Sequence, residues 1–404
     1  MFKKLLFLLC VFSVFSSAFA EEKMLHLYHD ADWSNHPESA ESIWRGVQLA
    51  LSEVDYRVQG YQLALQKKNH SGNVTRSLKN NKAFLTDPKA LALISGIHSP
   101  PLIKNRQFIN ENKVLTLVPW AAGGPITRYP SGDNWVFRLS VDDTKAGAVL
   151  VNYAVNTKGC KKPHLLLERS PWGDSNLKNM SAALAAKALP DPDVTQFSWN
   201  LKAFTASDML LKISASGADC ILFVANALEG VQFADAMVGL SSDKRLPIIS
   251  HWGITAGDFH EKIDAEKRAK LDLSFIQSCF SFHDAPLSDK GRDVLNQAML
   301  LYPEAIKGPS DIRSPVGFIH GYDLTKLLLA AIDTISLSDD IAVNRKLIRS
   351  ALEKIDKPIS GLVKTYQKPF DVYSESNPDA HEALGSDDYC MAYYDKNNNI
   401  ILRK

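Results

Sequence analysis

The chain has 404 residues, of which 45% are hydrophobic and 23% charged, an ordinary composition for a globular protein. Lysine and arginine number 46, and aspartate and glutamate 45, so the formal net charge is only +1. This balance offers no electrostatic basis for binding nucleic acid or an anionic membrane surface. The length is too great for one small domain and predicts two.

The first twenty residues have the features of a secretory signal peptide. Lys3 and Lys4 precede an apolar run, and small residues end at an Ala-x-Ala cleavage site after Ala20. The run is short for a membrane span of about 20 residues, and no later segment is long enough for one. We therefore expect a protein exported to the periplasm. Its mature chain has 44 basic and 45 acidic residues, a net charge of −1.

Apolar runs and helix-start signals alternate along the first part of the chain. The clearest unit runs over 90–127, where two apolar runs flank a helix that begins at Pro100 and Pro101. Such a unit is a right-handed βαβ crossover. In this part we expect strands at 24–28, 61–66, 90–95, 114–118 and 135–139. We expect helices at 37–54, from a cap at Asn73, from residue 100, and from a cap at Asp142 or Asp143 to residue 153.

The same alternation restarts after residue 160, which predicts a second sheet. There we expect strands at 164–167, 194–199, 220–224 and 246–250, with helices at 172–186, 207–215 and 228–240. A strand at about 273–282, helices at about 290–301, 317–335 and 344–355, and a strand-rich tail over 359–402 follow. The predicted fold class is α/β, with two doubly wound parallel sheets.

Polar and aromatic residues follow the predicted strands. His98 and Ser99 follow the strand at 90–95, and Trp120 follows the strand at 114–118. Open α/β sheets bind ligands beyond the carboxyl ends of their strands. We therefore expect these three residues to line a ligand cleft.

The positions of the tryptophans support a cleft between two lobes. Four of the seven lie just beyond predicted strand ends, two in each half of the chain, and a loop tryptophan is unusual unless something covers it. The alternative is that each packs locally. These four are Trp33, Trp120, Trp172 and Trp252, whereas Trp44, Trp135 and Trp199 fall within predicted elements and are interpreted as packing residues.

Signatures of catalysis are missing from the sequence. It has no G-x-S-x-G, H-E-x-x-H, P-loop or dinucleotide-binding glycine pattern, and no two of its 11 histidines are spaced i, i+4. We therefore predict no catalytic residue, metal site or cofactor. His29, Asp30 and Asp32 form a cluster for which an acid–base or metal role is conceivable, but a polar loop at a strand end is favoured.

Four cysteines remain in the mature chain. Export permits disulfides, but two of the cysteines lie in apolar strand-like runs, so buried free thiols are the favoured interpretation. The four are Cys160, Cys220, Cys279 and Cys390.

Several segments together resemble a known family. They are RGVQLALSEV, LISGIHSPP…ENKVLTLVPWAAGGP, WVFRLSVDD, ERSPWGDS, GADCILFVANALEG and GYDLTKLLLAAI. The chain is similar to type I periplasmic substrate-binding proteins of ABC transporters, in the leucine/isoleucine/valine- and amide-binding group. The resemblance implies two lobes joined by three crossovers, near Asp143, Leu273 and Ile355. Lobe 1 would comprise 21–143 plus 274–355, and lobe 2 would comprise 144–273 plus 356–404.

The resemblance also implies where a ligand is held. A serine hydroxyl and backbone N–H groups from lobe 1 would bind a carboxylate, and an aromatic ring and a loop from lobe 2 would face them. The residues matched in this way are Ser99, Trp120, Ala121, Ala122, Trp172 and Asn226, to which the strand-end pattern adds Trp33 and Trp252.

One position departs from the family pattern. Amino-acid binders carry a glutamate for the ligand ammonium where this chain has Trp252. The ammonium partner is therefore absent or is supplied by Asp30, Asp32 or Glu229. A free α-amino acid is therefore less favoured than an amide, aromatic or quaternary-amine ligand, since tryptophan faces attract cations.

The resulting functional hypothesis is a monomeric periplasmic binding protein, not an enzyme. It would deliver a small amino-acid-like, amide or aromatic/cationic ligand to an ABC permease in the inner membrane. The alternative is a sensor of the same fold that acts on a membrane receptor, and an exported enzyme is a third possibility. Neighbouring permease and ATPase genes would favour import.

Overall fold

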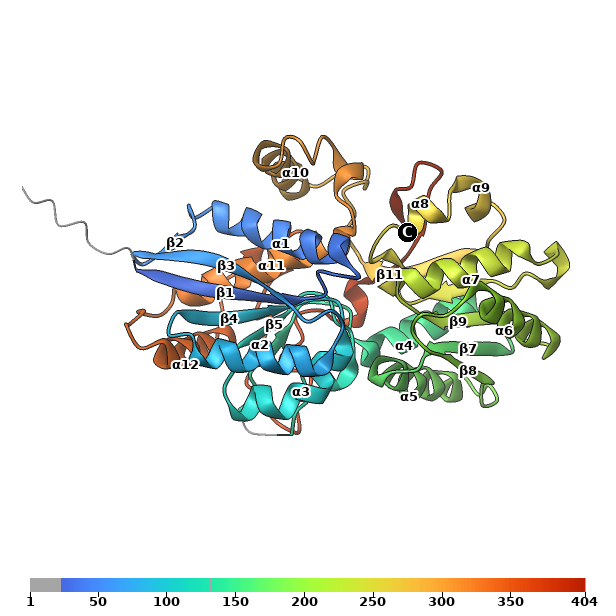
Figure 1. Ribbon diagram of the computed structural model, residues 1–404, viewed down its shortest axis with the longest axis horizontal. Coiled ribbons are helices and arrows are strands. Elements are labelled where there is room, and N and C mark those ends of the chain that lie inside the picture. Colours follow the sequence, from blue (N-terminus) through green and yellow to red (C-terminus); the bar gives the residue numbers. More distant parts are fainter. Residues whose placement is uncertain (1–22, 131–132, 404) are drawn as a thin grey trace, which may run out of the picture.

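The computed structural model describes residues 23–130 and 133–403. The predicted signal peptide therefore lies outside the described residues. Two α/β lobes lie side by side, each with a central sheet between layers of helices (Figure 1). This confirms the α/β class and the predominantly parallel sheets expected from the sequence.

The sheet of the first lobe has six strands in the order β2-β3-β1-β4-β5-β6. Every neighbouring pair is parallel except β2–β3. Helices α1 and α11 (Pro315–Ile332) cover one face, and α2 and α3 cover the other (Figure 1). The strands and helices up to the first crossing are β1 (Met24–Ala31), α1 (Pro37–Ser52), β2 (Arg57–Val58), β3 (Tyr61–Asn69), α2 (Val74–Thr86), β4 (Ala90–Ser95), α3 (Ser99–Glu111), β5 (Thr116–Val118) and β6 (Val136–Arg138).

The sheet of the second lobe has seven strands in the order β15-β14-β11-β10-β9-β7-β8. Its two C-terminal strands are antiparallel to their neighbours, whereas the others are parallel. The elements are α4 (Asp143–Asn152), β7 (Pro163–Glu168), α5 (Pro171–Ala186), β8 (Val194–Phe197), α6 (Ala203–Ala215), β9 (Cys220–Val224), α7 (Ala227–Gly239), β10 (Ile248–Ser250), α8 (Phe259–Lys262), α9 (Ala265–Arg268), β11 (Leu273–Ser278), β14 (Tyr389–Tyr394) and β15 (Ile400–Arg403).

Between β11 and β14 the chain returns to the first lobe. This stretch comprises α10 (Asp289–Leu301), α11 (Pro315–Ile332), α12 (Ile341–Leu352), β12 (Ile359–Ser360) and β13 (Thr365–Tyr366). Helix α11 packs along α1 at very close range, because a Cβ at Gly46 would lie 2.1 Å from the Phe318 carbonyl oxygen. A larger residue at this position would separate the two helices.

Local signals in the sequence set several helix starts. The Asn73 side chain accepts a hydrogen bond from the Arg76 amide, and the Asp142 side chain accepts one from the Thr144 amide. Asn73 was predicted as a cap, and Asp142 was one of two alternatives with Asp143. Both side chains satisfy amides that have no partner within the helix. The prolines in the first turn of α3 also lie as predicted.

The lobe limits inferred from the resemblance misplace two parts of the chain, strand β11 and the β12–β13 hairpin. Strand β11 pairs with β10 and β14, so residues 274–278 lie in the second sheet and not in lobe 1. The β12–β13 hairpin is held to α11, because Asp323 accepts hydrogen bonds from the Leu362 and Val363 amides. It therefore lies against the first lobe and not in lobe 2. Strand pairing is decided by distant residues, which an apolar run does not reveal.

The four cysteines form two disulfides, Cys160–Cys220 and Cys279–Cys390. The interpretation of buried free thiols was therefore wrong. The apolar runs around Cys220 and Cys279 do belong to strands or strand ends, but a neighbouring element brings a second sulfur to each.

Removing the Cys279–Cys390 disulfide is expected to lower the free energy of unfolding by about 2–4 kcal/mol. This bridge joins residues 111 positions apart, and such a link restricts the unfolded chain. Urea unfolding of the C279A/C390A double variant, measured without reductant, tests the expectation. Unfolding at the wild-type urea concentration would show that the bridge contributes nothing.

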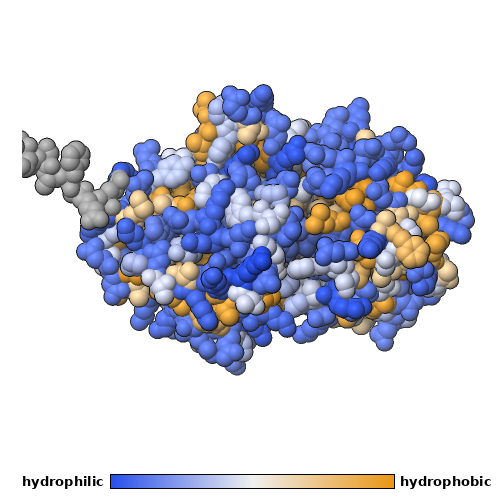
Figure 2. All heavy atoms as spheres, in the orientation of Figure 1, coloured by the Kyte–Doolittle hydropathy of each residue, from blue (hydrophilic) through white to orange (hydrophobic). Residues whose placement is uncertain are grey.

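The face of the molecule in Figure 2 is mostly hydrophilic, and hydrophobic atoms gather over α6 and α7 in the second lobe. Phe204, Leu211 and Leu228 on these helices are exposed. Among the described residues, no helix has the length and apolarity needed to cross a membrane.

Candidate functional site

Loops from the carboxyl ends of both sheets meet where the lobes face each other. Buried in this interface, the Trp120 ring lies 5.9 Å from the Trp252 ring, and the Trp172 ring lies 5.1 Å from that of His251. Asn226 approaches Trp172, since a Cβ at the intervening Gly253 would lie within 3.1 Å of both side chains. We refer to Trp120, Trp172, His251 and Trp252 as the inner cluster.

The groups predicted to bind a carboxylate contact other protein groups in this arrangement. The Ser99 hydroxyl oxygen accepts a hydrogen bond from the Gly123 amide at 3.0 Å. The Gly124 amide donates across the interface to the Ser175 hydroxyl, also at 3.0 Å. Ala121 and Ala122 are buried beside them. The structure thus brings seven predicted residues to the lobe interface, but packs them against each other and their neighbours.

An ionic network links two of the chain segments that pass between the lobes. Arg138, which is fully buried, contacts Glu382 at 2.6 Å and Asp142 at 2.8 Å. Arg128 contacts the other carboxylate oxygen of Asp142 at 2.6 Å. Burial alone would raise the pKa of Asp142, but the two guanidinium groups lower it to about 2.

His320 of α11 links three elements at the same interface. One ring nitrogen contacts the Pro119 carbonyl at 3.0 Å, and the other contacts the Ser278 hydroxyl at 3.0 Å. Burial lowers the pKa of His320 to about 4, although the hydrogen bond to Pro119 opposes the shift. The imidazole is therefore neutral at pH 7.

The low pKa of His320 makes the fold sensitive to acid. An unfolded histidine titrates near pH 6.5, so the unfolded chain takes up a proton first as the pH falls. Below about pH 6.5 this group lowers the free energy of unfolding by about 1.4 kcal/mol per pH unit, to a total of about 3 kcal/mol near pH 4. Urea unfolding of H320Q across this range should show a correspondingly smaller pH slope. An unchanged slope would contradict the neutral assignment.

A second set of loops encloses a pocket of about 240 Å³, which we call the outer pocket. Its walls come from strand ends of both lobes. The first lobe contributes Asp32, Asn35, His36, Ser71 and His98, and the second contributes Trp199, Asn200, Asn226, Leu228 and Glu229. The volume suits a small solute and falls below the roughly 300–1,000 Å³ of typical drug-sized sites.

Acidic and imidazole groups lie close together in the outer pocket. His98 Nε2 is 3.1 Å from Asp32 Oδ2, and the His36 and His98 rings are 5.0 Å apart. Burial would raise the pKa of Asp32, but hydrogen bonds from His98 and Asn35 hold it below its usual range. Burial, with Glu168 nearby, raises the pKa of Glu229 on the opposite lobe.

Some sequence-based assignments do not match this geometry. Trp33 lies away from the interface, where its ring faces Lys67 at 4.0 Å and lines a separate groove along α1. Trp199, interpreted as a packing residue, is 41% exposed and lies 5.6 Å from His98 across the interface. The predicted strand included Trp199, whereas β8 ends at Phe197 and leaves the indole on a loop. A shorter strand prediction would have placed it with the other strand-end tryptophans.

Of the three acidic residues predicted as partners for a ligand cation, only two line the outer pocket. The Asp30 carboxylate accepts hydrogen bonds from the Ser77 hydroxyl and the Asn80 side-chain amide, both on α2. It does not line the outer pocket. Asp32 and Glu229 do line it, from opposite lobes. Both were named from the sequence as alternative partners for a cationic group.

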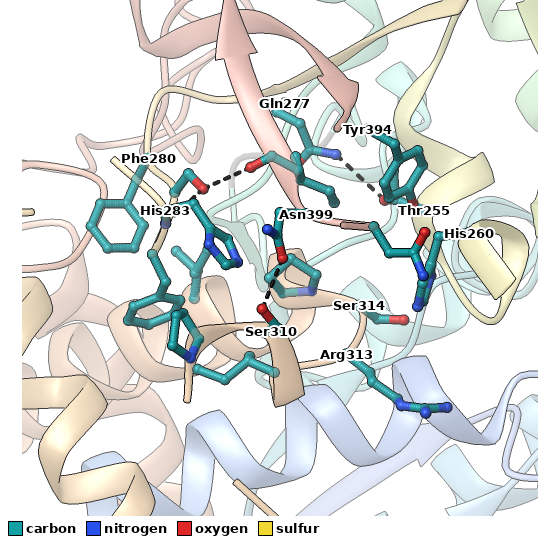
Figure 3. A pocket seen from close by; sticks show the side chains of 18 residues that line it. Thr255, His260, Gln277, Phe280, His283, Ser310, Arg313, Ser314, Tyr394 and Asn399 are labelled. Atoms are coloured by element: carbon teal, nitrogen blue, oxygen red, sulfur yellow. Dashed lines mark hydrogen bonds between the residues drawn. The ribbon is translucent and has the colours of Figure 1, made fainter. Parts of the chain in front are cut away.

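Another pocket lies between the second lobe and the segment before α11 (Figure 3). Gln277 and Thr255 on one side form a hydrogen bond at 3.4 Å, and Ser310 donates to Asn399 at 2.8 Å. Its open space is about 40 Å³, close to the volume of one water molecule. It is too small for an organic solute.

Solved structures with the same fold cover nearly all of the chain. A type 1 periplasmic binding protein from Bordetella pertussis has 17% identity and a TM-score of 0.77, covering 94% of this chain and 100% of that one. The leucine-binding protein LivK of Thermotoga maritima has 16% identity and a TM-score of 0.72, covering 94% and 98%.

A solute-binding protein from R. palustris, solved in complex with benzoate, has 16% identity and a TM-score of 0.73, covering 94% and 95%. At this level of identity these structures establish the fold. No curated protein matches the chain.

Two α/β lobes that face each other through their strand-end loops define a two-lobed binding-protein fold. The family model described as periplasmic binding protein matches residues 34–362, most of the chain. The chain belongs to this family.

Proposed function

We propose that this protein is an exported solute-binding protein that closes its two lobes on a small solute and presents it to an ABC importer. The observation that carries the proposal is the outer pocket, which receives side chains from the strand-end loops of both lobes. A solute held there would contact both lobes and favour their closed arrangement.

The lining of the outer pocket supports a solute that carries positive charge or amide groups. Asp32 and Glu229 offer carboxylates from opposite lobes, and Asn200 and Asn226 add polar groups. The exposed face of Trp199 completes the wall and would favour a cation or a planar group. The inner cluster is buried between the lobes, and lobe opening would bring Ser99 and Trp120 within reach of an entering solute.

A thermal-shift screen followed by calorimetry tests this proposal. The panel contains amino acids, amides, aromatic acids and quaternary amines, and a true solute raises the melting temperature as its concentration exceeds its dissociation constant. We expect E229Q to weaken binding of the best cationic solute at least about tenfold. D208N, which changes an exposed carboxylate on α6, serves as the matched control.

Two results would contradict the proposal. One is a screen in which no solute changes the melting temperature. The other is a solute whose affinity is the same in E229Q, W199A and wild type, because such a solute would bind outside the outer pocket.

A further inference from the structure

Three potential metal ligands from two loops of the first lobe meet in the outer pocket. Asp32 follows β1, His36 directly precedes α1, and His98 directly precedes α3. One ligand atom from each lies within 4.8 Å of the others. The three residues are only 3%, 7% and 6% exposed. Such a compact, buried group differs from the exposed acidic clusters that are common on protein surfaces.

The distances suit a shared ion. Two ligand atoms bound to one zinc-like ion at about 2.0–2.1 Å lie roughly 3–3.4 Å apart. His98 Nε2 and Asp32 Oδ2 are 3.1 Å apart. The pair is therefore already at the separation that a common ion requires.

Neighbouring groups orient the ligands as in metal sites. His36 is hydrogen-bonded to the Ala256 carbonyl of the second lobe, and a neutral imidazole that donates from one nitrogen has a lone pair on the other. Asn35 donates to both carboxylate oxygens of Asp32, at 3.1 and 3.0 Å. These contacts hold the ring of His36 and the carboxylate of Asp32 in place before any ion binds.

We propose that Asp32, His36 and His98 bind one divalent first-row transition-metal ion, which is the cationic centre of the solute. This inference rests on the proposed function for the role of the ion as solute. Two imidazoles and a carboxylate favour ions such as Zn²⁺, Co²⁺ or Ni²⁺ over Mg²⁺ and Ca²⁺, which prefer oxygen ligands. The ion takes the place of the hydrogen between His98 Nε2 and Asp32 Oδ2, and the neutral ring then carries its hydrogen on Nδ1.

The remaining coordination positions would face the second lobe. Glu229, Asn226 and Trp199 line that wall of the outer pocket. Water or a small chelating molecule can fill these positions. The Cys160–Asp219–Cys220 group, also compact, does not compete for the ion, because its two sulfurs are joined in a disulfide.

The test uses the mature chain without a histidine tag, stripped of metal with a chelator. Co²⁺ alone is titrated by calorimetry, and its visible absorption reports the coordination. We expect one ion per chain with a dissociation constant of about 1 µM or lower. H36Q and H98Q should each weaken binding at least about tenfold, whereas H283Q, a histidine outside the outer pocket, should not change it.

Circular dichroism and the melting temperature, both measured on metal-free protein, establish whether each variant folds. If a histidine variant does not fold, D32N is used in its place. The metal inference is overturned if Co²⁺ and Zn²⁺ fail to bind at one per chain, or if binding is unchanged in H36Q, H98Q and D32N. In that case, an organic solute whose binding is still weakened by E229Q would continue to support the proposed function. Conversely, the ion could bind without changing the radius of gyration measured by small-angle scattering. That result would support the metal site and count against closure of the lobes on a solute.

Discussion

Replacing Arg138 by methionine is expected to lower the free energy of unfolding by about 3–5 kcal/mol. The guanidinium is fully buried and contacts two buried carboxylates, those of Glu382 and Asp142. It also donates to the carbonyls of Ala121 and Gly123, at 3.2 and 2.9 Å. Methionine fills much of the volume, but leaves the carboxylate of Glu382 and both carbonyls without this donor.

Urea unfolding at neutral pH measures the effect. K212M is the matched control, because Lys212 pairs with Asp208 on an exposed helix face and its loss should change stability by no more than about 0.5 kcal/mol. Adding E382Q to R138M should restore part of the loss, since it removes the uncompensated charge. A loss below about 1 kcal/mol in R138M would contradict the role given to this network.

Truncating Trp120 to alanine is expected to cost about 3–5 kcal/mol of stability. The indole is 2% exposed and packs against Trp252, and a Cβ at Gly317 would lie 3.0 Å from its ring. Removing it would leave a cavity beneath the lobe interface. The sequence predicted instead that this residue acts mainly as a ligand contact, with at least about a tenfold loss of affinity in W120A.

Trp199 provides the matched comparison. Because it is 41% exposed and lines the outer pocket, W199A should leave the free energy of unfolding within about 1 kcal/mol of wild type while weakening solute binding. Thermal unfolding and calorimetry on both variants separate the two roles. If W120A were as stable as wild type and lost only affinity, the inner cluster would be a ligand surface rather than core.

Local sequence signals were sufficient for most of the fold. The periodic apolar runs, the caps at Asn73 and Asp142 and the prolines that open α3 all act within a few residues of their position. Non-local features were missed. The assignment of β11 to the second sheet and the pairing of four cysteines depend on partners more than a dozen residues away, which no local pattern encodes.

The candidate site shows the same division. Strand-end loops were the right place to look, and His98, Asp32, Asn226 and Glu229 were all named from the sequence. Trp33 was misplaced, because a loop tryptophan can turn onto its own lobe, as this one does against Lys67. The proximity of His36 and His98 was missed, since they are 62 residues apart and only the parallel sheet brings their loops together.

The central claim is that the two lobes hold a solute, and mass spectrometry of the protein purified from its exported form tests it most directly. Native spectra should show about one bound small molecule or ion per chain, released chemically unchanged when the protein is denatured. Metal analysis of the same sample should identify any ion. Recovery of a conversion product, or of bare protein that no compound in the screen stabilises, would contradict the account.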